Sequence, residues 1–384
     1  MYFMQIIEFG MAPECRKGGI ESYLINYYRE FIKLNINCDF IAFSGYEMSY
    51  QNEILQRGSK IYKISERNSN VIKSLYDAVK LFWNIRNKYD VIVLNMGGAP
   101  QYAIFLALAY CAGISKRIVH AHGACAENSR DGVRCVIDFI DKMFVKVFAT
   151  DYWACSLSAG KHLFPNKNCN IIKNAIDIDR YRYNAAVRKK VRKELEISDS
   201  CILIGMVGRF VQIKNFHFML PVLCKLLKNK ANVKLIVVGD YTAADCKICA
   251  EDFQSEMKRR NLDDYIIMYG KCDCVADMYQ AMDVFVVPSF LEGLSFVTIE
   301  AQTSGLPCLV STGVPQEAIV CKSMIERISL DEEPHVWAET ILRLYNEHAK
   351  ERCDNSEFVR KAGYDIKTEA KKIKVGLSSD ILGC

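Results

Sequence analysis

The amino-acid sequence predicts an α/β protein made of two doubly wound parallel sheets, and three observations support this fold class. With 384 residues, the chain is longer than one ordinary domain. Short apolar runs alternate with amphipathic helical runs, which is typical of parallel sheets covered by helices. The alternation is interrupted once, by a charged stretch over residues 177–200, and then starts again.

The first half of the chain predicts one sheet in an N-terminal domain over residues 1–178. After the first apolar run, the paired glycines Gly18 and Gly19 lead into an expected helix over Ile20–Leu34. The strands expected here are Gln5–Phe9, Cys38–Phe43, Val91–Asn95, Arg117–His120 and Tyr152–Cys155.

The second half predicts another sheet, in a C-terminal domain over residues 179–364, and a helix at about 365–384 is expected to rejoin the first domain. One helix is placed over Asn215–Leu227. Ligands bind at the carboxyl edges of such sheets, so a small-molecule site is expected in a cleft between the two domains. The expected strands, apolar on both faces, are Cys201–Val207, Val233–Val238, Ile266–Tyr269, Val284–Val287 and, as the last, Leu306–Ser311.

The charge distribution narrows the class of partner. The net charge is +5, and residues 1–175 hold 21 Lys and Arg against 15 Asp and Glu, so the positive excess lies in the first half. A modest basic surface suits an anionic membrane or a phosphate-bearing ligand, with an ordinary solvated face as the alternative. Because no dense basic run with interleaved aromatics occurs, nucleic acid is not expected as a partner.

The 17 cysteines predict reduced thiols. Many lie inside apolar runs, and the first residues lack the basic-then-apolar order of a secretion signal, which favours a cytoplasmic protein. A zinc site is the alternative for Cys246 and Cys249 with Cys272 and Cys274. The spacing of the second pair does not match a zinc ribbon, so we expect no metal site.

The strongest motif is PSFLEGLSFVTIEA at 288–301, between an expected strand and a helix. Ser295 suits the N-cap, with its hydroxyl accepting a backbone N–H of the first turn. Glu292 then lies in the loop and Glu300 in the second helical turn. The alternative is an ordinary capped helix with two surface acids. A phosphate or sugar oxygen would be favoured at the positive end of this helix, near the backbone amides of Gly293, Leu294, Ser295 and Phe296.

A second motif, GRFVQIKN at 208–215, also joins a strand to a helix. Arg209 offers a planar fork of donors and Lys214 a mobile point charge, and both suit a diphosphate. Cations at a helix N-terminus disfavour the helix, a cost that an anion between them would offset. A surface charge pair is the alternative.

Two weaker signals come from the first half. At period two, His120 and His122 point to the same face of a strand, and His122 lies at its carboxyl edge. A structural histidine is the alternative, and a metal pair lacks a nearby carboxylate. Gly18 and Gly19 permit close backbone approach to a ligand. They do not form the dinucleotide pattern G-x-G-x-x-G, which argues against an NAD enzyme.

Taken in this order, these motifs resemble the retaining glycosyltransferases of family 4. That family has the GT-B fold, two Rossmann-like doubly wound domains facing a central cleft. The resemblance covers nearly the full chain and is greatest to enzymes of capsular polysaccharide, exopolysaccharide or lipid-linked glycan assembly. It is carried by Gly18-Gly19, His120-Ala-His122, Gly208-Arg209 with Lys214-Asn215, and Glu292-x7-Glu300, with further matches at Ala154–Ser156, Asn174–Asp177 and Asp283–Ser289.

The resemblance implies a role for each matching residue. Arg209 and Lys214 would hold the donor diphosphate and neutralise the leaving group. Glu292 would contact the donor sugar hydroxyls, with the backbone amides that follow it, and Glu300 the nucleotide ribose. His122 would lie beside the reacting sugar. Gly19, with Gly18 before it, would lie near the distal phosphate. Ala121 and Leu294-Ser295 depart from the commonest pattern at positions that bear on which sugar is used.

The implied reaction moves a sugar from a nucleoside diphosphate sugar, a UDP-sugar in our expectation, to a hydroxyl of a growing lipid-linked glycan. The anomeric configuration is retained, and no metal or other cofactor takes part. The C-terminal domain would bind the donor and the N-terminal domain the acceptor. A GT-B nucleotide-sugar epimerase, a phosphorylase and a non-catalytic subunit of a glycan-assembly complex remain alternatives.

One segment of the first half suggests a membrane contact. Over Val133–Ala149, apolar residues recur at helical spacing, and basic residues lie off that face. A core helix is one interpretation. The other is an interfacial helix that rests on anionic lipid at the inner face of the membrane. The expected apolar face is Val136, Ile137, Ile140, Phe144, Val147 and Phe148, and the residues off that face are Arg134, Lys142 and Lys146, with Asp138 and Asp141 among them.

Overall fold

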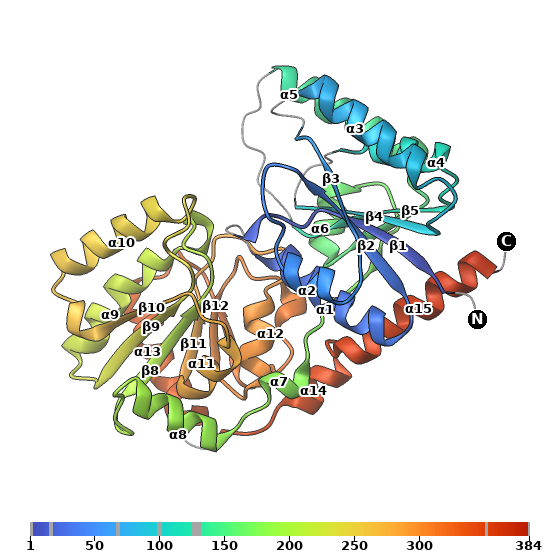
Figure 1. Ribbon diagram of the computed structural model, residues 1–384. Helices are drawn as coiled ribbons and strands as arrows, with labels where there is room; N and C mark the ends of the chain where they lie inside the picture. The colour runs from blue at the N-terminus through green and yellow to red at the C-terminus, as the bar shows by residue number, and fades with distance from the viewer. Residues whose placement is uncertain are drawn as a thin grey trace. The chain divides into compact units, whose positions relative to one another are not determined.

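The computed structural model describes residues 3–14, 18–66, 70–97, 102–123, 132–349 and 352–382, without the side chains of 132–135 and 380–382. The chain forms two compact units. Unit 1 is Met1–Ala175 with Ile366–Cys384, and unit 2 is Ile176–Asp365. Each is a parallel sheet with helices on both faces, so the two doubly wound sheets predicted from the sequence are confirmed (Figure 1).

Unit 1 holds a seven-stranded parallel sheet in the order β3-β2-β1-β4-β5-β6-β7. The strand order reverses between β1 and β4, whose carboxyl ends lie side by side. Such a reversal is where ligands bind in open α/β sheets. The strands are β1 (Gln5–Phe9), β2 (Asn37–Phe43), β3 (Ile61–Ile64), β4 (Val91–Met96), β5 (Lys116–Ala121), β6 (Asp151–Ala154) and β7 (Asn170–Ile171).

Helices cover both faces of this sheet. Figure 1 shows α3, α4 and α5 over one face and α1 with α15 over the other. The last helix, α15, returns to unit 1 and packs along α1, where Lys374 Nζ donates to the carbonyl of Leu34 at 2.8 Å. The helices are α1 (Gly19–Lys33), α2 (Gln51–Gln56), α3 (Val71–Asn84), α4 (Ile104–Cys111), α5 (Gly132–Phe148), α6 (Leu157–Leu163) and α15 (Ile366–Leu382).

Unit 2 repeats the plan with a six-stranded parallel sheet in the order β10-β9-β8-β11-β12-β13. The order reverses between β8 and β11. The strands are β8 (Ile202–Val207), β9 (Val233–Val238), β10 (Ile266–Gly270), β11 (Val284–Val287), β12 (Cys308–Ser311) and β13 (Ile325–Ile328). The helices are α7 (Ile178–Tyr181), α8 (Ala185–Glu194), α9 (Met219–Lys228), α10 (Lys247–Arg259), α11 (Val275–Ala281), α12 (Phe296–Thr303), α13 (Pro334–Leu344) and α14 (Ser356–Lys361).

Within unit 2, the charged stretch that interrupts the strand pattern is bonded to the carboxylate of Asp283. Asp283 Oδ1 lies 2.5 Å from Arg188 Nη2, and Asp283 Oδ2 lies 3.0 Å from Arg192 Nη1. The same Oδ2 accepts the backbone N–H of Leu203 at 2.7 Å. Because Arg192 and Asp283 are both almost wholly buried, this polar anchor ties α8 to β8 and to the start of β11.

Three strands escaped the sequence analysis, and one expected helix start was wrong. Leu306–Ser311 was the last strand clear in the sequence, but β13 follows it. The edge strands β3 and β7 were missed, because four and two residues are too few to show a period. The helix expected over Asn215–Leu227 begins only at Met219. Two 3₁₀ turns precede it, and Asn215 between them has a left-handed backbone, with φ of 52°.

Candidate functional site

In unit 2 the loops that follow β8 and β11 lie together at the reversal of strand order. The backbone N–H of Phe290 donates to the carbonyl of Ile213 at 2.8 Å, which ties one loop to the other. The N–H of Glu292 donates to the carbonyl of Gly313, after β12, at 3.0 Å. These bonds hold the residues of the GRFVQIKN and PSFLEGLS motifs at one place on the sheet edge.

The centre of this site is an ion pair between Lys214 and Glu292. Lys214 Nζ lies 2.7 Å from Oε1 and 3.0 Å from Oε2 of the carboxylate. Ser289 Oγ also donates to Glu292 Oε1, at 2.7 Å. The carboxylate is almost buried, at 9% exposure, whereas a quarter of the lysine side chain remains exposed. Lys214 is therefore a partly exposed cation whose position is fixed by a buried acid.

Arg209 takes a different partner from Lys214. Its guanidinium pairs with Asp245, just before α10, and about a third of each side chain is exposed. An ion pair that exposed contributes little to stability, and the guanidinium has five N–H donors to offer. Because α9 begins at Met219, Lys214 does not flank a helix N-terminus as the sequence suggested. The cost expected for a cation at a helix N-terminus therefore does not arise, and Lys214 is paired with Glu292.

Gly239 allows the ends of β8 and β9 to approach each other closely. A Cβ atom on Gly239 would stand 1.8 Å from the carbonyl oxygen of Gly208, well inside van der Waals contact. A glycine is therefore required where these two strands turn into their loops. Gly208 immediately precedes Arg209, so this approach sets the path of the loop that carries both candidate cations.

Glu300 lies in the second turn of α12, as predicted, and is held by a buried tyrosine. Tyr279 OH donates to Glu300 Oε2 at 2.8 Å. Burial raises the pKa of Glu300, while hydrogen bonds from Tyr279 and Tyr181 lower it less. This carboxylate is thus an acceptor in a largely dry environment, which suits recognition of hydroxyl groups.

The N-cap of α12 differs in detail from the sequence prediction. Ser295 is the N-cap residue, but its side chain makes no bond to a backbone N–H of the first turn. Instead, Thr298 Oγ1 donates to Ser295 Oγ at 2.9 Å. Gly293 is half-buried, and Leu294, Ser295 and Phe296 are buried, so this turn is part of the packed interior.

In unit 1 the carboxyl ends of β1, β4 and β5 hold a buried polar network. Asn95 on β4 links Glu8 on β1 to His122, which directly follows β5. Asn95 Nδ2 donates to Glu8 Oε2 at 2.7 Å, and Asn95 Oδ1 lies 2.8 Å from His122 Nε2. Burial raises the pKa of Glu8 to about 8 and lowers that of His122 to about 3. At neutral pH the network therefore carries a protonated acid and a neutral imidazole.

Hydrogen-bond chemistry assigns the tautomer of His122. Asn95 Nδ2 also donates to the carbonyl of Phe9 at 3.1 Å, which fixes the amide with Oδ1 toward the histidine. An amide oxygen only accepts, so His122 Nε2 carries the proton. His122 Nδ1 is then an acceptor, and it is buried without a hydrogen-bond partner among the described residues.

The two histidines share one face, as period two predicts. Their ring centroids are 3.9 Å apart, and the ring of Tyr23 packs against both. His120 is fully buried, and its pKa is well below the usual value, first because of burial and then because of His122. His120 therefore serves as a neutral packing residue, and His122 lies nearer the sheet edge.

Gly18 and Gly19 form the start of α1, with Gly18 at the N-cap. The sequence analysis missed Glu21, which fixes this loop. Its carboxylate accepts the backbone N–H of Gly18 at 2.7 Å and that of Ala12 at 3.0 Å. The capping-box spacing, an acid three residues after the N-cap, was the signal that pointed to it.

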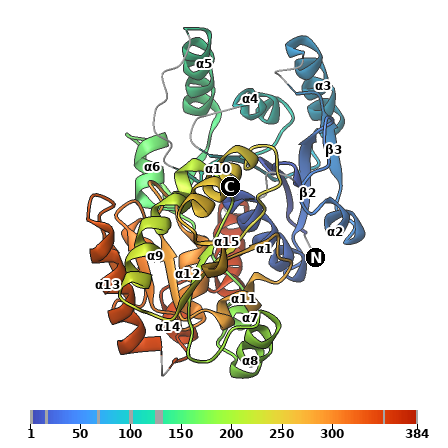
Figure 2. The same ribbon diagram turned by 90° about the vertical axis from the view of Figure 1, so that its left-hand side faces the viewer.

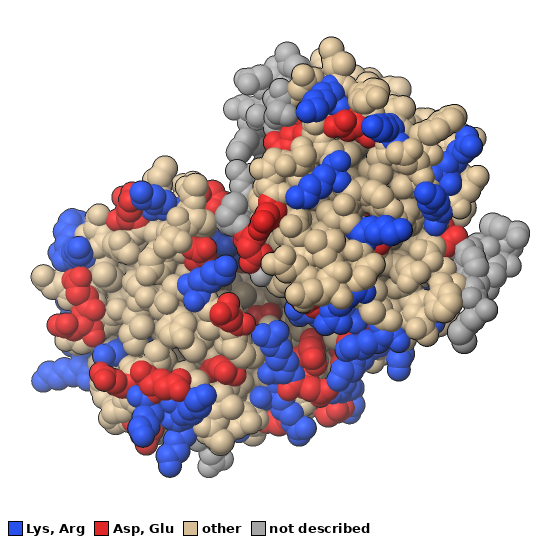
Figure 3. Space-filling view, in the orientation of Figure 1, with Lys and Arg blue, Asp and Glu red and all other residues tan. Residues whose placement is uncertain are grey.

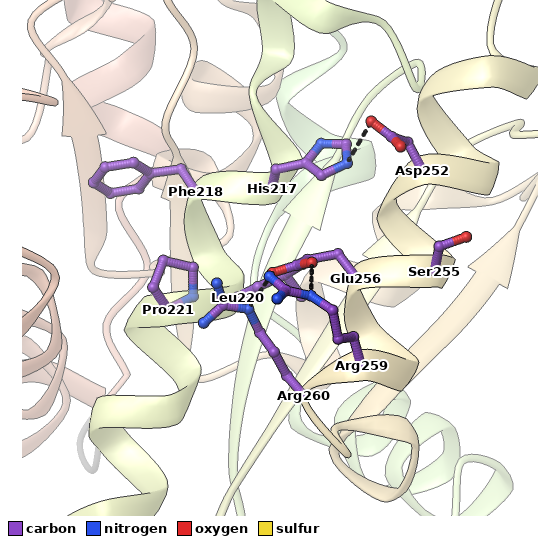
Figure 4. A pocket seen from close by; sticks show the side chains of 9 residues that line it. All are labelled: His217, Phe218, Leu220, Pro221, Asp252, Ser255, Glu256, Arg259 and Arg260. Atoms are coloured by element: carbon purple, nitrogen blue, oxygen red, sulfur yellow. Dashed lines mark hydrogen bonds and ion pairs between the residues drawn. The ribbon is translucent and has the colours of Figure 1, made fainter.

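Another hollow of unit 2 lies between η3 (Phe216–Phe218), α9 and α10 (Figure 4). It measures about 510 Å³, and its charged side chains satisfy one another. Arg259 and Arg260 both pair with Glu256. A cavity of only about 10 Å³ lies beside Lys214 and Glu292. We assign the site to the loops after β8 and β11, because they lie at the reversal of strand order, where open α/β sheets bind ligands.

Comparison with known proteins identifies a domain in unit 2. Residues 201–347, which contain all six strands of the unit 2 sheet, match the family "Glycosyl transferases group 1". The chain carries a group 1 glycosyl transferase domain. EpsF of Bacillus subtilis, named as a glycosyltransferase, is 28% identical over 365 residues, which cover 91% of this chain and 90% of EpsF.

Two further comparisons extend over both units of this glycosyltransferase. UDP-Gal:alpha-D-GlcNAc-diphosphoundecaprenol alpha-1,3-galactosyltransferase of Escherichia coli is 25% identical over 258 residues, 64% of each chain. The crystal structure of Anabaena Alr3699/HepE in complex with UDP and glucose superimposes with a TM-score of 0.78 at 15% identity, covering 98% of this chain and 100% of that one. The fold of the glycosyltransferase is therefore GT-B, as the resemblance implied.

The described residues of the glycosyltransferase provide neither a metal-ligand cluster nor a membrane-spanning helix. Among the residues that the structure describes, there is no group of three or more His, Cys, Asp or Glu side chains that could hold a metal ion. Cys246, Cys249, Cys272 and Cys274, raised above as a zinc alternative, are free thiols. Within the same ranges, no helix is both long and apolar enough to cross a bilayer.

Glu8 and Asn95 were missed by the sequence analysis, although each carried a signal. Glu8 is an acid inside the apolar run Gln5–Phe9, and Asn95 is an amide inside Val91–Met96. Acids and amides are seldom fully buried unless they are paired. A polar residue near the carboxyl end of an otherwise apolar strand is therefore a marker of a ligand edge.

Proposed function

We propose that this glycosyltransferase moves a sugar from a nucleoside diphosphate sugar, of the UDP type, to a hydroxyl of a growing lipid-linked glycan. The observation that carries the proposal is the Lys214–Glu292 pair at the reversal of strand order in a group 1 domain. The names of relatives support the substrate class. The E. coli relative is named for UDP-Gal and a diphosphoundecaprenol-linked acceptor, and the HepE structure holds UDP and glucose.

In this proposal Lys214 and Arg209 bind the donor diphosphate. Lys214 is already oriented by Glu292, so little side-chain entropy is lost when it binds an anion. Arg209 would exchange Asp245 for the phosphates, at small cost because that ion pair is about a third exposed. As the sugar departs, negative charge grows on the diphosphate, and two fixed cations stabilise it.

Glu292 acts in the proposal as a hydrogen-bond acceptor for donor sugar hydroxyls. Its carboxylate already accepts from Lys214 and Ser289, which favours a binding role over nucleophilic attack. We therefore propose attack on the same face from which the diphosphate departs, so that the anomeric configuration is retained. Glu300 accepts hydrogen bonds from the nucleotide ribose.

His122 contributes from unit 1 as a neutral acceptor. Its unprotonated Nδ1 suits a hydroxyl of the reacting sugar, and Asn95 keeps the proton on Nε2. We place Asn95 and Glu8 as positioning residues that act through His122. Gly18 and Gly19 are proposed to lie near the distal phosphate, held by Glu21.

The proposed reaction needs no metal, because Lys214 and Arg209 supply the positive charge at the diphosphate. The test is turnover in EDTA, followed by addition of Mg²⁺ or Mn²⁺. We expect equal rates throughout. Activity that vanishes in EDTA and returns with the metal would contradict this part of the proposal.

The free thiols of the described cysteines also support action in a reducing compartment such as the cytoplasm.

Calorimetry with UDP tests the donor site. Loss of one charge-assisted contact costs about 1.5–3 kcal/mol, so Lys214→Ala and Arg209→Ala should each weaken UDP about 10- to 150-fold. Lys228→Ala, which removes an exposed lysine from the last turn of α9, is the matched control and should bind as wild type. Unchanged affinity in both site variants would remove these residues from the donor site.

Mass spectrometry of the products tests the reaction. The enzyme is incubated with a panel of UDP-sugars and a lipid-linked acceptor extract. A new glycoside together with free UDP supports transfer. An isomerised nucleotide sugar would indicate an epimerase, and a requirement for inorganic phosphate would indicate a phosphorylase. UDP binding without any product from the whole panel would favour a non-catalytic subunit.

A further inference from the structure

Helix α3 presents an apolar stripe to solvent. Ile72, Tyr76 and Trp83 are 82%, 64% and 69% exposed, and Leu75 and Val79 are exposed between them. These positions recur at helical spacing on one side of the helix. The opposite side packs onto the sheet through Ala78, Leu81 and Phe82. The stripe is therefore not the core face of the helix.

Helix α5 presents a second stripe of the same kind. The sequence predicted its apolar face at Ile137, Phe144 and Phe148 as well, but these three are only half-exposed. Arg134 lies outside the side chains that the structure describes. Asp141 and Val145 are buried on the inner side of the helix. The exposed apolar residues, 45–65% accessible, are Val136, Phe139, Ile140, Met143 and Val147.

The most exposed charges beside the two stripes are positive. Lys73 and Lys80 on α3 and Lys142 and Lys146 on α5 are exposed. Among the acids of the same helices, Asp141 is buried, and Asp77 and Asp138 are half-exposed. Asp77 accepts from the backbone and hydroxyl of Ser65, and Asp141 accepts the N–H of Ala103 at 3.0 Å. Lysines are therefore the only fully exposed charged side chains on the described part of α3 and on α5 from residue 136 onward.

The two helices belong to one face of unit 1. Both pack against α4, and Figure 2 shows α3 and α5 on either side of it. Figure 1 shows all three helices on the same side of the sheet. The exposed ring of Tyr110 lies on α4 between them. Figure 3 shows basic side chains, with a few acidic ones, among uncharged surface over this part of unit 1. A monomer seldom exposes so much apolar surface without a use for it.

We propose that the exposed face of α3 and α5 is a docking surface for an anionic lipid bilayer. Apolar stripes flanked by lysine, with tryptophan and tyrosine among them, are the features of helices that lie in the membrane interface. The lysines attract anionic headgroups, and the stripes enter the boundary of the acyl chains. The proposal rests on this surface alone, and it stands or falls separately from the donor chemistry proposed above.

The fluorescence of Trp83 can report the proposed contact with the membrane directly. The chain has three tryptophans, and the other two, Trp153 and Trp337, are buried. Lipids brominated on their acyl chains quench tryptophan only on contact. With vesicles containing phosphatidylglycerol, we expect quenching of the exposed tryptophan and co-flotation of the full-length protein. With pure phosphatidylcholine vesicles both signals should be much weaker, and high salt should reduce them.

Paired variants separate the two parts of the surface. Lys73→Glu/Lys80→Glu and Lys142→Glu/Lys146→Glu should each reduce flotation on anionic vesicles several-fold. Ile72→Ser with Met143→Ser should reduce it at any salt concentration. Ile248→Ser on α10 of unit 2, where the residue is 78% exposed, is the apolar control, and Lys228→Glu is the charge control. Both controls should float as wild type, and thermal melting checks that every variant is folded.

Three results would overturn the proposal. One is the absence of flotation and of quenching on anionic vesicles. Another is equal flotation of the helix variants and the wild type. The third is sedimentation of the lipid-free protein as a dimer that Ile72→Ser/Met143→Ser dissociates, because the surface would then be an interface between two copies of the chain. If the helix variants bind UDP as tightly as the wild type does, their loss of flotation is not caused by damage to the donor site.

Discussion

Unit 1 carries a neutral, buried polar network at the carboxyl edge of its sheet, whereas unit 2 carries an ion pair that solvent reaches. Glu8 and His122 are both driven to their neutral forms by burial. Lys214 keeps a quarter of its side chain exposed beside Glu292. Two sheets of the same kind, each with one reversal of strand order, thus hold opposite chemistry at that point. The unit 2 edge suits a charged diphosphate, and the unit 1 edge suits uncharged hydroxyls.

The largest effect is expected from the buried ion pairs of unit 2. Asp283→Ala leaves Arg192 buried and without its carboxylate, which should cost about 3–5 kcal/mol of unfolding free energy. Urea denaturation of wild type and variant measures this. Asp245→Ala, which removes the much more exposed partner of Arg209, is the control and should cost less than about 1 kcal/mol. Equal losses in the two variants would show that burial does not set the value of these pairs.

A pH-dependent effect is expected in unit 1. The folded pKa of Glu8, about 8, lies above its ordinary value of 4.5, so the folded state binds the extra proton. Its contribution to stability is present below about pH 4.5 and is lost as pH rises toward 8, by up to about 1.4 kcal/mol per pH unit. Glu8→Gln cannot titrate and should lack this loss.

The measurement is the difference in unfolding free energy between wild type and Glu8→Gln at several pH values from 5 to 8. His122 contributes with the opposite sign, because its folded pKa is lowered to about 3 and its stability is lost as pH falls below about 6.5. Since both proteins keep His122, the comparison cancels that part. A difference that stays constant across the range would mean that Glu8 is ionised in the folded protein.

A smaller effect is expected from the link between the two groups. Asn95→Ala leaves Glu8 and His122 buried without their shared partner, at a cost of about 1–3 kcal/mol. Nitrogen NMR of the imidazole should show the proton on Nε2 in the wild type and a mixture of tautomers in the variant. A purely structural asparagine would lower stability without changing the tautomer. Wild-type protein with the proton on Nδ1 would contradict the assignment.

Most strands could be read from the sequence, because four or more apolar residues bounded by glycine, proline or charge make a strong local signal. The short edge strands β3 and β7 escaped, because two to four partly exposed residues do not make such a signal. Ser295 was recognised as an N-cap residue from its position, but its actual partner, Thr298, could not be. A hydroxyl rotates to whichever neighbour packing supplies. The start of α9 was misplaced because a left-handed asparagine inside a helical pattern leaves no trace in periodicity.

By itself the sequence determined the fold class, the two repeats of the strand pattern and the residue types at the strand ends, all of which follow from local periodicity and turn chemistry. Only the tertiary structure decided which of those residues meet. Lys214 and Glu292 are 78 positions apart, and Asn95 is 87 positions from Glu8. They come together because the reversal of strand order sets β8 beside β11 and β1 beside β4. The order of strands in a sheet is a property of packing, and no short segment carries it.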